Sequence, residues 1–148
     1  MEIGRDFKEF IGLLNKYNVE YLLVGGYAVA MYGYPRYTGD IDFWVKPTKE
    51  NAKKIINVLN DFGFEGLDIS ENDFNEPDKV VQLGFPPNRI DIITSVTGLN
   101  FDESFLDKKI IEISDVKTNF ISLFHLRINK NATGRDKDRT DLNNLPEK

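Results

Sequence analysis

The sequence predicts a mixed α and β domain, written α/β or α+β, in which a small mixed sheet is flanked by helices. Near the N-terminus, Phe7, Phe10, Ile11 and Leu14 recur at helical spacing, so one face of a helix is apolar. Short β-rich runs such as residues 40–45 alternate apolar and polar side chains, which is typical of strands. Glycines and prolines separate these segments.

The first half of the chain reads as helix and strand in alternation. A helix over 5–17 precedes a buried strand over 19–24, which stops at a glycine pair. A short helix over 27–32 ends near Gly33, and a second strand follows over 40–45. Thr48 is a good N-cap for a helix over 49–62 that ends at Gly63.

The second half contains a predicted hairpin. Strands over 79–85 and 89–95 are joined by Pro86-Pro87-Asn88. Residues 66–78 are acidic and irregular, so we expect an exposed loop there. Beyond the hairpin, we expect a short strand over 110–113 and helices over 121–129 and 135–145.

Length and composition favour one domain with its own core. The chain has 148 residues, of which 41% are hydrophobic, and a domain commonly holds about 100–150 residues. We expect a catalytic core over about 1–116 and a C-terminal helical segment over about 117–148. The lack of cysteine excludes disulfides and thiolate metal sites. No secretory signal or membrane span is evident, so we expect a soluble, cytoplasmic protein.

The charge distribution is uneven. The net charge is −5, but residues 117–148 carry a net of +3, which leaves −8 for the first 116 residues. An acidic chain argues against broad nucleic-acid binding, which leaves a basic footprint. An acidic body with a basic end suits a site that needs both metal-binding carboxylates and phosphate-binding cations, although a solvated helix surface would look the same.

A glycine pair and two aspartates stand close together in the sequence. Gly25-Gly26 follows an apolar run, and backbone amides at such a strand-to-helix junction favour an anion. After thirteen intervening residues, Asp40 and Asp42 lie at i and i+2 of a strand and therefore share one face. Two carboxylates about 7 Å apart along a strand can converge on a metal. Taken alone, each motif is more often a plain turn or a surface feature.

Asp91 makes the metal interpretation the favoured one. It is a carboxylate within the otherwise apolar strand Arg89-Ile90-Asp91-Ile92-Ile93, and a buried carboxylate needs a partner. A neighbouring strand carrying Asp40 and Asp42 would give it a shared cation, for which Mg²⁺ is the natural choice. The alternative is an ion pair with Arg89 or a lysine at a sheet edge.

These residues resemble the polymerase-beta-like nucleotidyltransferase superfamily. The stretch VGGYAVAMYGYPRYTGDIDFWV is similar to the AbiEii/MenT-type toxin nucleotidyltransferases and their small relatives. The run from Asn129 to Leu142 resembles the closing helical motif of that group. The resemblance implies a polymerase-beta-like core, two Mg²⁺ ions (or Mn²⁺) and a nucleoside triphosphate substrate such as ATP.

The resemblance also implies a role for each matching residue. Asp40, Asp42 and Asp91 would be the metal ligands, and Asp91 would also accept the proton of the attacking hydroxyl. The expected nucleotide-binding residues are Gly25, Gly26, Arg36, Thr38, Lys130, Arg135 and Lys137. Charge pairing along a helix is the ordinary explanation for Lys130, Arg135 and Lys137.

We therefore expect transfer of a nucleoside monophosphate from the triphosphate to an acceptor hydroxyl, with release of pyrophosphate. The acceptor stays open at this point. The toxin resemblance implies tRNA or a protein, with an antitoxin as partner, whereas antibiotic nucleotidyltransferases use a similar pattern on small molecules. A catalytically silent nucleotide-binding domain is the rival class, and a calcium or structural role ranks last because the EF-hand spacing is absent. A homodimer that completes the cleft is also compatible with the short chain.

Overall fold

One mixed sheet forms the centre of the molecule in the computed structural model, which describes residues 3–35, 38–64 and 68–147. The strands are β1 (Tyr21–Val24), β2 (Asp40–Val45), β3 (Val80–Leu83), β4 (Arg89–Ile93), β5 (Lys109–Ile113) and β6 (Val116–Phe120). Within these residues they form a six-stranded sheet in the order β3-β4-β2-β1-β6-β5. The predicted fold class is confirmed.

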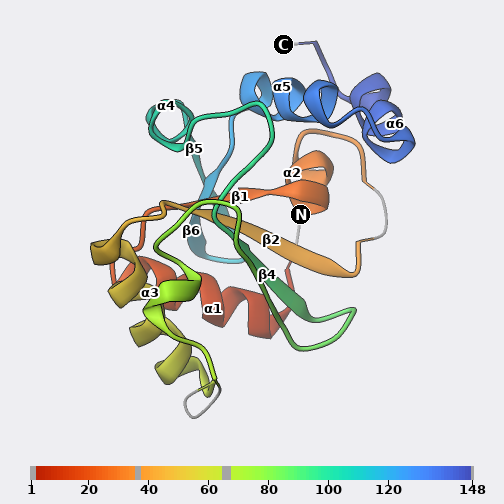
Figure 1. Ribbon diagram of the computed structural model, residues 1–148. Coiled ribbons are helices and arrows are strands. Elements are labelled where there is room, and N and C mark those ends of the chain that lie inside the picture. The colour runs from red at the N-terminus through yellow and green to blue at the C-terminus, as the bar shows by residue number, and fades with distance from the viewer. Residues whose placement is uncertain (1–2, 36–37, 65–67, 148) are drawn as a thin grey trace.

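Helices cover both faces of this sheet (Figure 1). They are α1 (Arg5–Lys16), α2 (Gly25–Met31), α3 (Lys49–Phe62), α4 (Phe101–Leu106), α5 (Leu123–Thr133) and α6 (Asp136–Asn144), with a 3₁₀ helix η1 (Glu71–Asp73). In Figure 1, α1 and α3 lie below the sheet, and α2, α5 and α6 lie above it.

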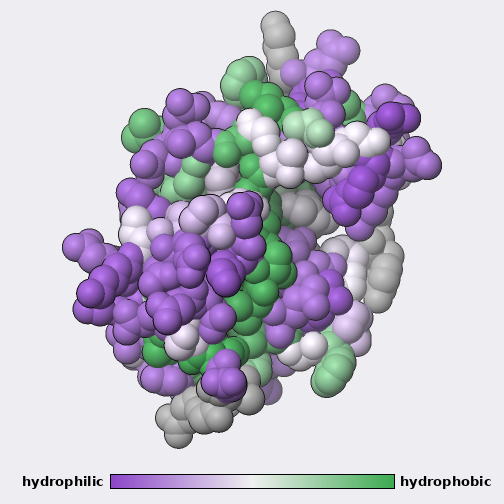
Figure 2. All heavy atoms as spheres, viewed as in Figure 1, coloured by the Kyte–Doolittle hydropathy of each residue, from purple (hydrophilic) through white to green (hydrophobic). Residues whose placement is uncertain are grey.

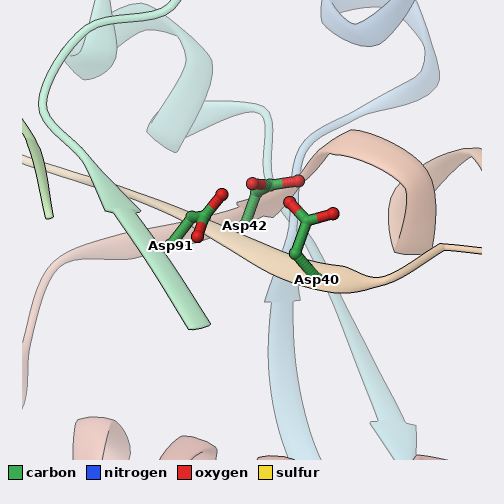
Figure 3. A group of neighbouring side chains, drawn as sticks. All are labelled: Asp40, Asp42 and Asp91. Atoms are coloured by element: carbon green, nitrogen blue, oxygen red, sulfur yellow. The ribbon is translucent and has the colours of Figure 1, made fainter. Parts of the chain in front are cut away.

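Residue alternation in β2 decides which side chains enter the core. Ile41, Phe43 and Val45 are fully buried, and the Phe43 ring lies 5.4 Å from that of Phe10 in α1. Asp40 and Asp42 alternate with them and so point to the opposite face, as Figure 3 shows. The apolar face of α1 was predicted from the same kind of reasoning, and its four apolar residues are buried.

The helix signals at α3 are also confirmed. The Thr48 side chain accepts a hydrogen bond from the Asn51 amide, and Gly63 ends the helix with a φ of 102°. Gly63 adopts a left-handed conformation that favours glycine.

The chain departs from the predicted elements in four places. α2 begins at Gly25 itself rather than at residue 27. The segment predicted as an exposed loop contains η1, closed by a capping box between Ser70 and Asp73, and is followed by the fully buried Phe74; residues 66 and 67 lie outside the described part. Neither α4 nor β6 was predicted. β6 spans Val116–Phe120 and so crosses the approximate boundary expected near residue 116; the division into a catalytic core and a C-terminal segment stays a prediction.

The surface seen in Figure 2 is divided by polarity. Hydrophilic side chains gather over α3 and over α6, and a hydrophobic strip lies between them. Among the described residues, no helix combines the length and the apolar character needed to cross a membrane.

Candidate active site

Three aspartates converge on one face of the sheet. β2 and β4 pair in parallel, and the register sets Asp42 directly beside Asp91. Asp40 lies two residues before Asp42 on the same face, so the three side chains point toward one another (Figure 3). One oxygen from each carboxylate lies within 4.8 Å of the other two. The structure thus brings together the three aspartates that the sequence singled out.

The glycine pair lies beside this cluster. In the antiparallel pairing of β1 with β2, Val24 is the partner of Asp42, and Gly25 follows at the start of α2. A Cβ atom on Gly25 would lie 2.2 Å from an Asp42 carboxylate oxygen. Gly25 also has a φ of +70°. Both facts require glycine here, because the backbone must turn in a left-handed conformation while passing against the carboxylate.

Arg89 binds two of the three carboxylates. Its Nε lies 2.9 Å from Asp91 Oδ1, and its Nη2 lies 3.1 Å from Asp91 Oδ2. The same Nη2 lies 3.5 Å from Asp40 Oδ2. The sequence offered an ion pair with Arg89 and a shared cluster as alternatives for Asp91, and the structure contains both.

The carboxyl groups differ in pKa because they are crowded and unequally buried. Burial, hydrogen bonding with Asp40 and the charges of Asp40 and Asp91 raise the pKa of Asp42 to about 8. Burial also raises the pKa of Asp91, although its bonds to Arg89 act against the change. Burial alone would raise the pKa of Asp40, but hydrogen bonding with the other two aspartates and the charges of Arg89 and Lys137 lower it.

This donor set fits a divalent cation. Three carboxylates supply only oxygen ligands, which Mg²⁺ and Mn²⁺ prefer. The raised pKa of Asp42 reflects first its burial and then the like charges held close to it, and a cation between the carboxylates would relieve that repulsion. Asp40, Asp42 and Asp91 are therefore the residues that would hold a metal.

Of the two residues expected just ahead of Asp40, one is described. Thr38 donates a hydrogen bond from Oγ1 to the Asp40 carbonyl, at 2.9 Å, and so fixes the entry into β2. Arg36 lies outside the described residues. The nucleotide-contacting roles expected for both stay predictions.

Lys130 is placed differently from Arg135 and Lys137. Its Nζ lies 3.1 Å from both Asp138 and Asp141, and all three residues are buried. This buried group joins α5 to α6. Lys130 is thus bound to carboxylates of its own chain, and its expected role on phosphate remains a prediction.

The other two basic residues lie near the aspartate cluster. Arg135 pairs with Asp138 at 2.6 Å while its side chain stays 69% exposed. The charge of Asp42 contributes to the raised pKa of Arg135, after the larger effect of Asp138. The charge of Lys137 helps to lower the pKa of Asp40. Charges at the start of α6 thus act on the aspartate cluster and are acted on by it, each as a minor cause.

His125 and Trp44 pack as ordinary core residues. His125 is 7% exposed and its Nδ1 lies 2.9 Å from Ser122 Oγ. Trp44 is 2% exposed and meets the Phe101 ring edge-on at 5.1 Å. Both side chains therefore belong to the packed interior.

Sequence reasoning did not assign a site role to Arg89, or any role to Asp138 and Asp141. The signal for Arg89 was present, since it lies at i−2 from Asp91 and therefore on the same strand face. The pairing of Lys130 with residues of a following helix depends on how α5 and α6 pack, which no local pattern reveals.

The mixed sheet, the three clustered aspartates and the glycine turn agree with the resemblance to nucleotidyltransferases noted in the sequence, and the sequence comparison gives the family. Residues 4–148 match the family described as "Nucleotidyl transferase of unknown function (DUF2204)". The chain belongs to that family of enzymes. None of the curated proteins matches the chain.

Two solved structures share the fold. One is the proposed nucleotidyltransferase TM1012 from Thermotoga maritima, with 16% identity and a TM-score of 0.64 over 94% of this chain and 89% of that one. The other is the lincosamide antibiotic adenylyltransferase LnuA, bound to lincomycin, with 17% identity and a TM-score of 0.58 over 97% of this chain and 96% of that one. These likenesses show that the chain shares its fold with both proteins.

Proposed function

We propose that the protein is a metal-dependent nucleotidyltransferase that moves a nucleoside monophosphate from a nucleoside triphosphate to an acceptor hydroxyl. The observation that supports this most is the convergence of Asp40, Asp42 and Asp91 to within 4.8 Å, directly beside the turn at Gly25. Membership of a nucleotidyl transferase family supports the same reaction class.

The three aspartates would hold Mg²⁺ together with the phosphates of the nucleotide. The bound metal supplies Lewis-acid stabilisation of charge on the reacting oxygens. Asp91 is the proposed acceptor of the hydroxyl proton, because its raised pKa makes it a better base than an ordinary aspartate. The acceptor oxygen then forms a bond to the α-phosphorus, the bond from that phosphorus to the bridging oxygen breaks, and pyrophosphate leaves.

The glycine turn and the start of α6 would bind the triphosphate. Gly25 lies against the Asp42 carboxylate and has no side chain, so a phosphate held there would meet none at this position. Gly26 is buried in α2, and its expected contact with the triphosphate stays a prediction. Arg135 and Lys137 would offset the charge that develops on pyrophosphate. Lys130 would act on the phosphates only by leaving Asp138 and Asp141, so we propose that it holds α6 in place instead.

A small molecule is the acceptor that we favour. LnuA, which has the same fold and nearly the same extent, is a lincosamide adenylyltransferase. The net charge of −5 also disfavours a large nucleic-acid surface. A pocket of about 300 Å³ is lined in part by Trp44, Thr94 and Phe101. It lies toward the C-terminal ends of β2 and β4, beyond the aspartates that these strands carry. Its volume is at the lower end of the range for small-molecule sites.

A toxin that modifies tRNA or protein is the second candidate. The motif around Gly25 and Asp40 and the basic run from Asn129 to Leu142 favour it, through their likeness to the AbiEii/MenT group. If this second function is the right one, we expect an antitoxin as a partner and a homodimer as the assembly.

The test is label transfer from each α-³²P nucleoside triphosphate in the presence of Mg²⁺. The acceptor panel contains a lincosamide, an aminoglycoside, total tRNA and a cell lysate. Asp42→Asn is compared with Asp6→Asn, a control on the exposed surface of α1. We expect label in a small molecule with the wild type and the control, and at least about a hundredfold less with Asp42→Asn. Label in tRNA or protein would favour the toxin, and undiminished transfer by Asp42→Asn would refute the mechanism.

A further inference from the structure

Arg89 occupies the same carboxylate oxygens that a metal would need. Both oxygens of Asp91 accept a hydrogen bond from its guanidinium, at 2.9 and 3.1 Å, in a two-point arrangement. The third contact, at 3.5 Å, reaches Asp40 Oδ2. A planar guanidinium is well suited to such paired contacts.

The position of Arg89 in the sheet accounts for these contacts. Arg89 precedes Asp91 by two residues in β4, so both side chains leave the same face. The parallel register also sets Arg89 beside Asp40 in β2. The Arg89 side chain therefore reaches both carboxylates directly from its place in the strand. Asp91 is only 5% exposed, so its pairing with Arg89 takes place largely away from solvent.

The pairing of Arg89 with the aspartates has an electrostatic function. Three carboxylates within 4.8 Å of one another repel, and the single positive charge of Arg89 offsets part of that repulsion. A divalent cation would offset it more completely, but it would also repel the guanidinium and need some of the same oxygens. Arg89 and the metal are therefore competitors for Asp91 and Asp40.

We propose that Arg89 is an internal counterion, which holds the carboxylates of Asp91 and Asp40 before a divalent cation arrives and has to give up contacts when it binds. Arg89 thereby lowers the affinity of the site for metal while stabilising the metal-free fold. The inference rests on the proposed function, since it assumes that the aspartates bind a metal.

Manganese binding tests the proposal without any assay of activity. Arg89→Met removes the charged guanidinium and keeps an unbranched side chain about as long as the aliphatic stem of arginine. We expect it to bind Mn²⁺ about tenfold more tightly than the wild type, measured by titration calorimetry or by the electron paramagnetic resonance signal of free Mn²⁺. Arg89→Lys keeps the charge but loses the two-point contact, so its affinity should lie in between. Arg5→Met, on the exposed surface of α1, controls for the general loss of one positive charge.

Thermal unfolding of the same variants gives a second measurement. In EDTA, Arg89→Met should melt at a lower temperature than the wild type, and saturating Mn²⁺ should reduce that difference. If Arg89→Met does not fold, Arg89→Gln replaces it with a neutral side chain that can still hydrogen-bond.

The outcomes separate this inference from the proposed function. If the wild type transfers label but Arg89→Met and Arg89→Gln bind Mn²⁺ no more tightly than it does, Arg89 is not a competitor and the inference is wrong. If the wild type neither binds Mn²⁺ nor transfers label, the proposed function fails and the inference fails with it.

Discussion

The contact between Gly25 and Asp42 is the most restrictive single feature of the site. A methyl group at Gly25 would lie 2.2 Å from the Asp42 oxygen and 3.0 Å from its Cγ. The contact can be relieved only if Asp42 moves or the turn opens. Because Asp42 is also the direct neighbour of Asp91, such a movement would separate the carboxylates.

Replacing Gly25 should therefore affect both stability and metal binding. We expect Gly25→Ala to lose more than about 1 kcal/mol of unfolding free energy, since the left-handed conformation alone costs alanine that much, and to bind Mn²⁺ more weakly than the wild type. Gly12→Ala is the matched control, because no atom lies within 4 Å of its added Cβ and it lies inside α1. Urea denaturation and Mn²⁺ titration measure the two effects. Equal behaviour of the two variants would contradict the role given to Gly25.

Asp42 should make the metal-free protein less stable as the pH rises. Its pKa in the folded protein is raised to about 8 from the ordinary 3.8. Between these values the folded state binds a proton that the unfolded state has lost, so this stabilisation is present below pH 4 and is lost as the pH approaches 8. Asp42→Asn carries an uncharged amide that resembles the protonated carboxyl group, so this variant should not lose stability in the same way as the pH rises.

The measurement is the melting temperature in EDTA from pH 5 to pH 9. We expect the wild type to fall relative to Asp42→Asn across this range, and added Mg²⁺ to diminish the fall at high pH. A wild type that gains stability relative to the variant as the pH rises would show that Asp42 is not held in a crowded carboxylate cluster.

At the level of elements, the buried ion group between α5 and α6 determines where the basic end of the chain lies. Asp138 accepts hydrogen bonds from Lys130 at 3.1 Å, Thr133 at 2.6 Å and Arg135 at 2.6 Å. These bonds fix the turn at Gly134, which has a φ of 66°. The start of α6 is thereby held against the end of α5.

Substitution of Lys130 should affect stability, whereas substitution of Lys137 should affect nucleotide binding. Lys130→Met removes the cation shared by Asp138 and Asp141, and we expect it to cost about 3–5 kcal/mol because buried carboxylates lose a paired charge. Lys137→Met is exposed and should change stability by less than about 0.5 kcal/mol, while raising the KM for the nucleotide. Urea denaturation and steady-state kinetics distinguish the two. A Lys130→Met variant as stable as the wild type would remove the basis for its structural assignment.

The sequence predicted β2, β4 and their aspartates because strand alternation and residue type are local properties. It did not predict β6, although β5 and β6 form a hairpin. Their turn places Ser114 and Asp115 at φ values of 50° and 70°, whereas such turns are usually recognised by Asn-Gly. The six residues of α4 are too few for a clear helical period. The pairing of Lys130 with Asp138 and Asp141 was missed because it depends on packing between two helices.

Over the whole molecule, the fold concentrates opposite charges at one place. The sheet presents its three aspartates on the face that α2, α5 and α6 cover (Figure 1, Figure 3), and the net-positive C-terminal region follows directly from the last strand. The acidic body and basic end noted in the sequence are therefore brought within electrostatic range, as the effect of Lys137 on the pKa of Asp40 shows. This is the face at which we propose that a triphosphate and its metal bind.

The position of the label after reaction tests the central claim most directly. The wild type is incubated with Mg²⁺ and the acceptor that the label-transfer test identifies. One reaction contains α-³²P nucleoside triphosphate and the other contains γ-³²P nucleoside triphosphate. Nucleotidyl transfer predicts that the α-label enters the acceptor and the γ-label leaves in pyrophosphate, and that both events disappear with Asp42→Asn. A γ-label in the acceptor, or no movement of either label despite Mg²⁺-dependent nucleotide binding, would contradict the account.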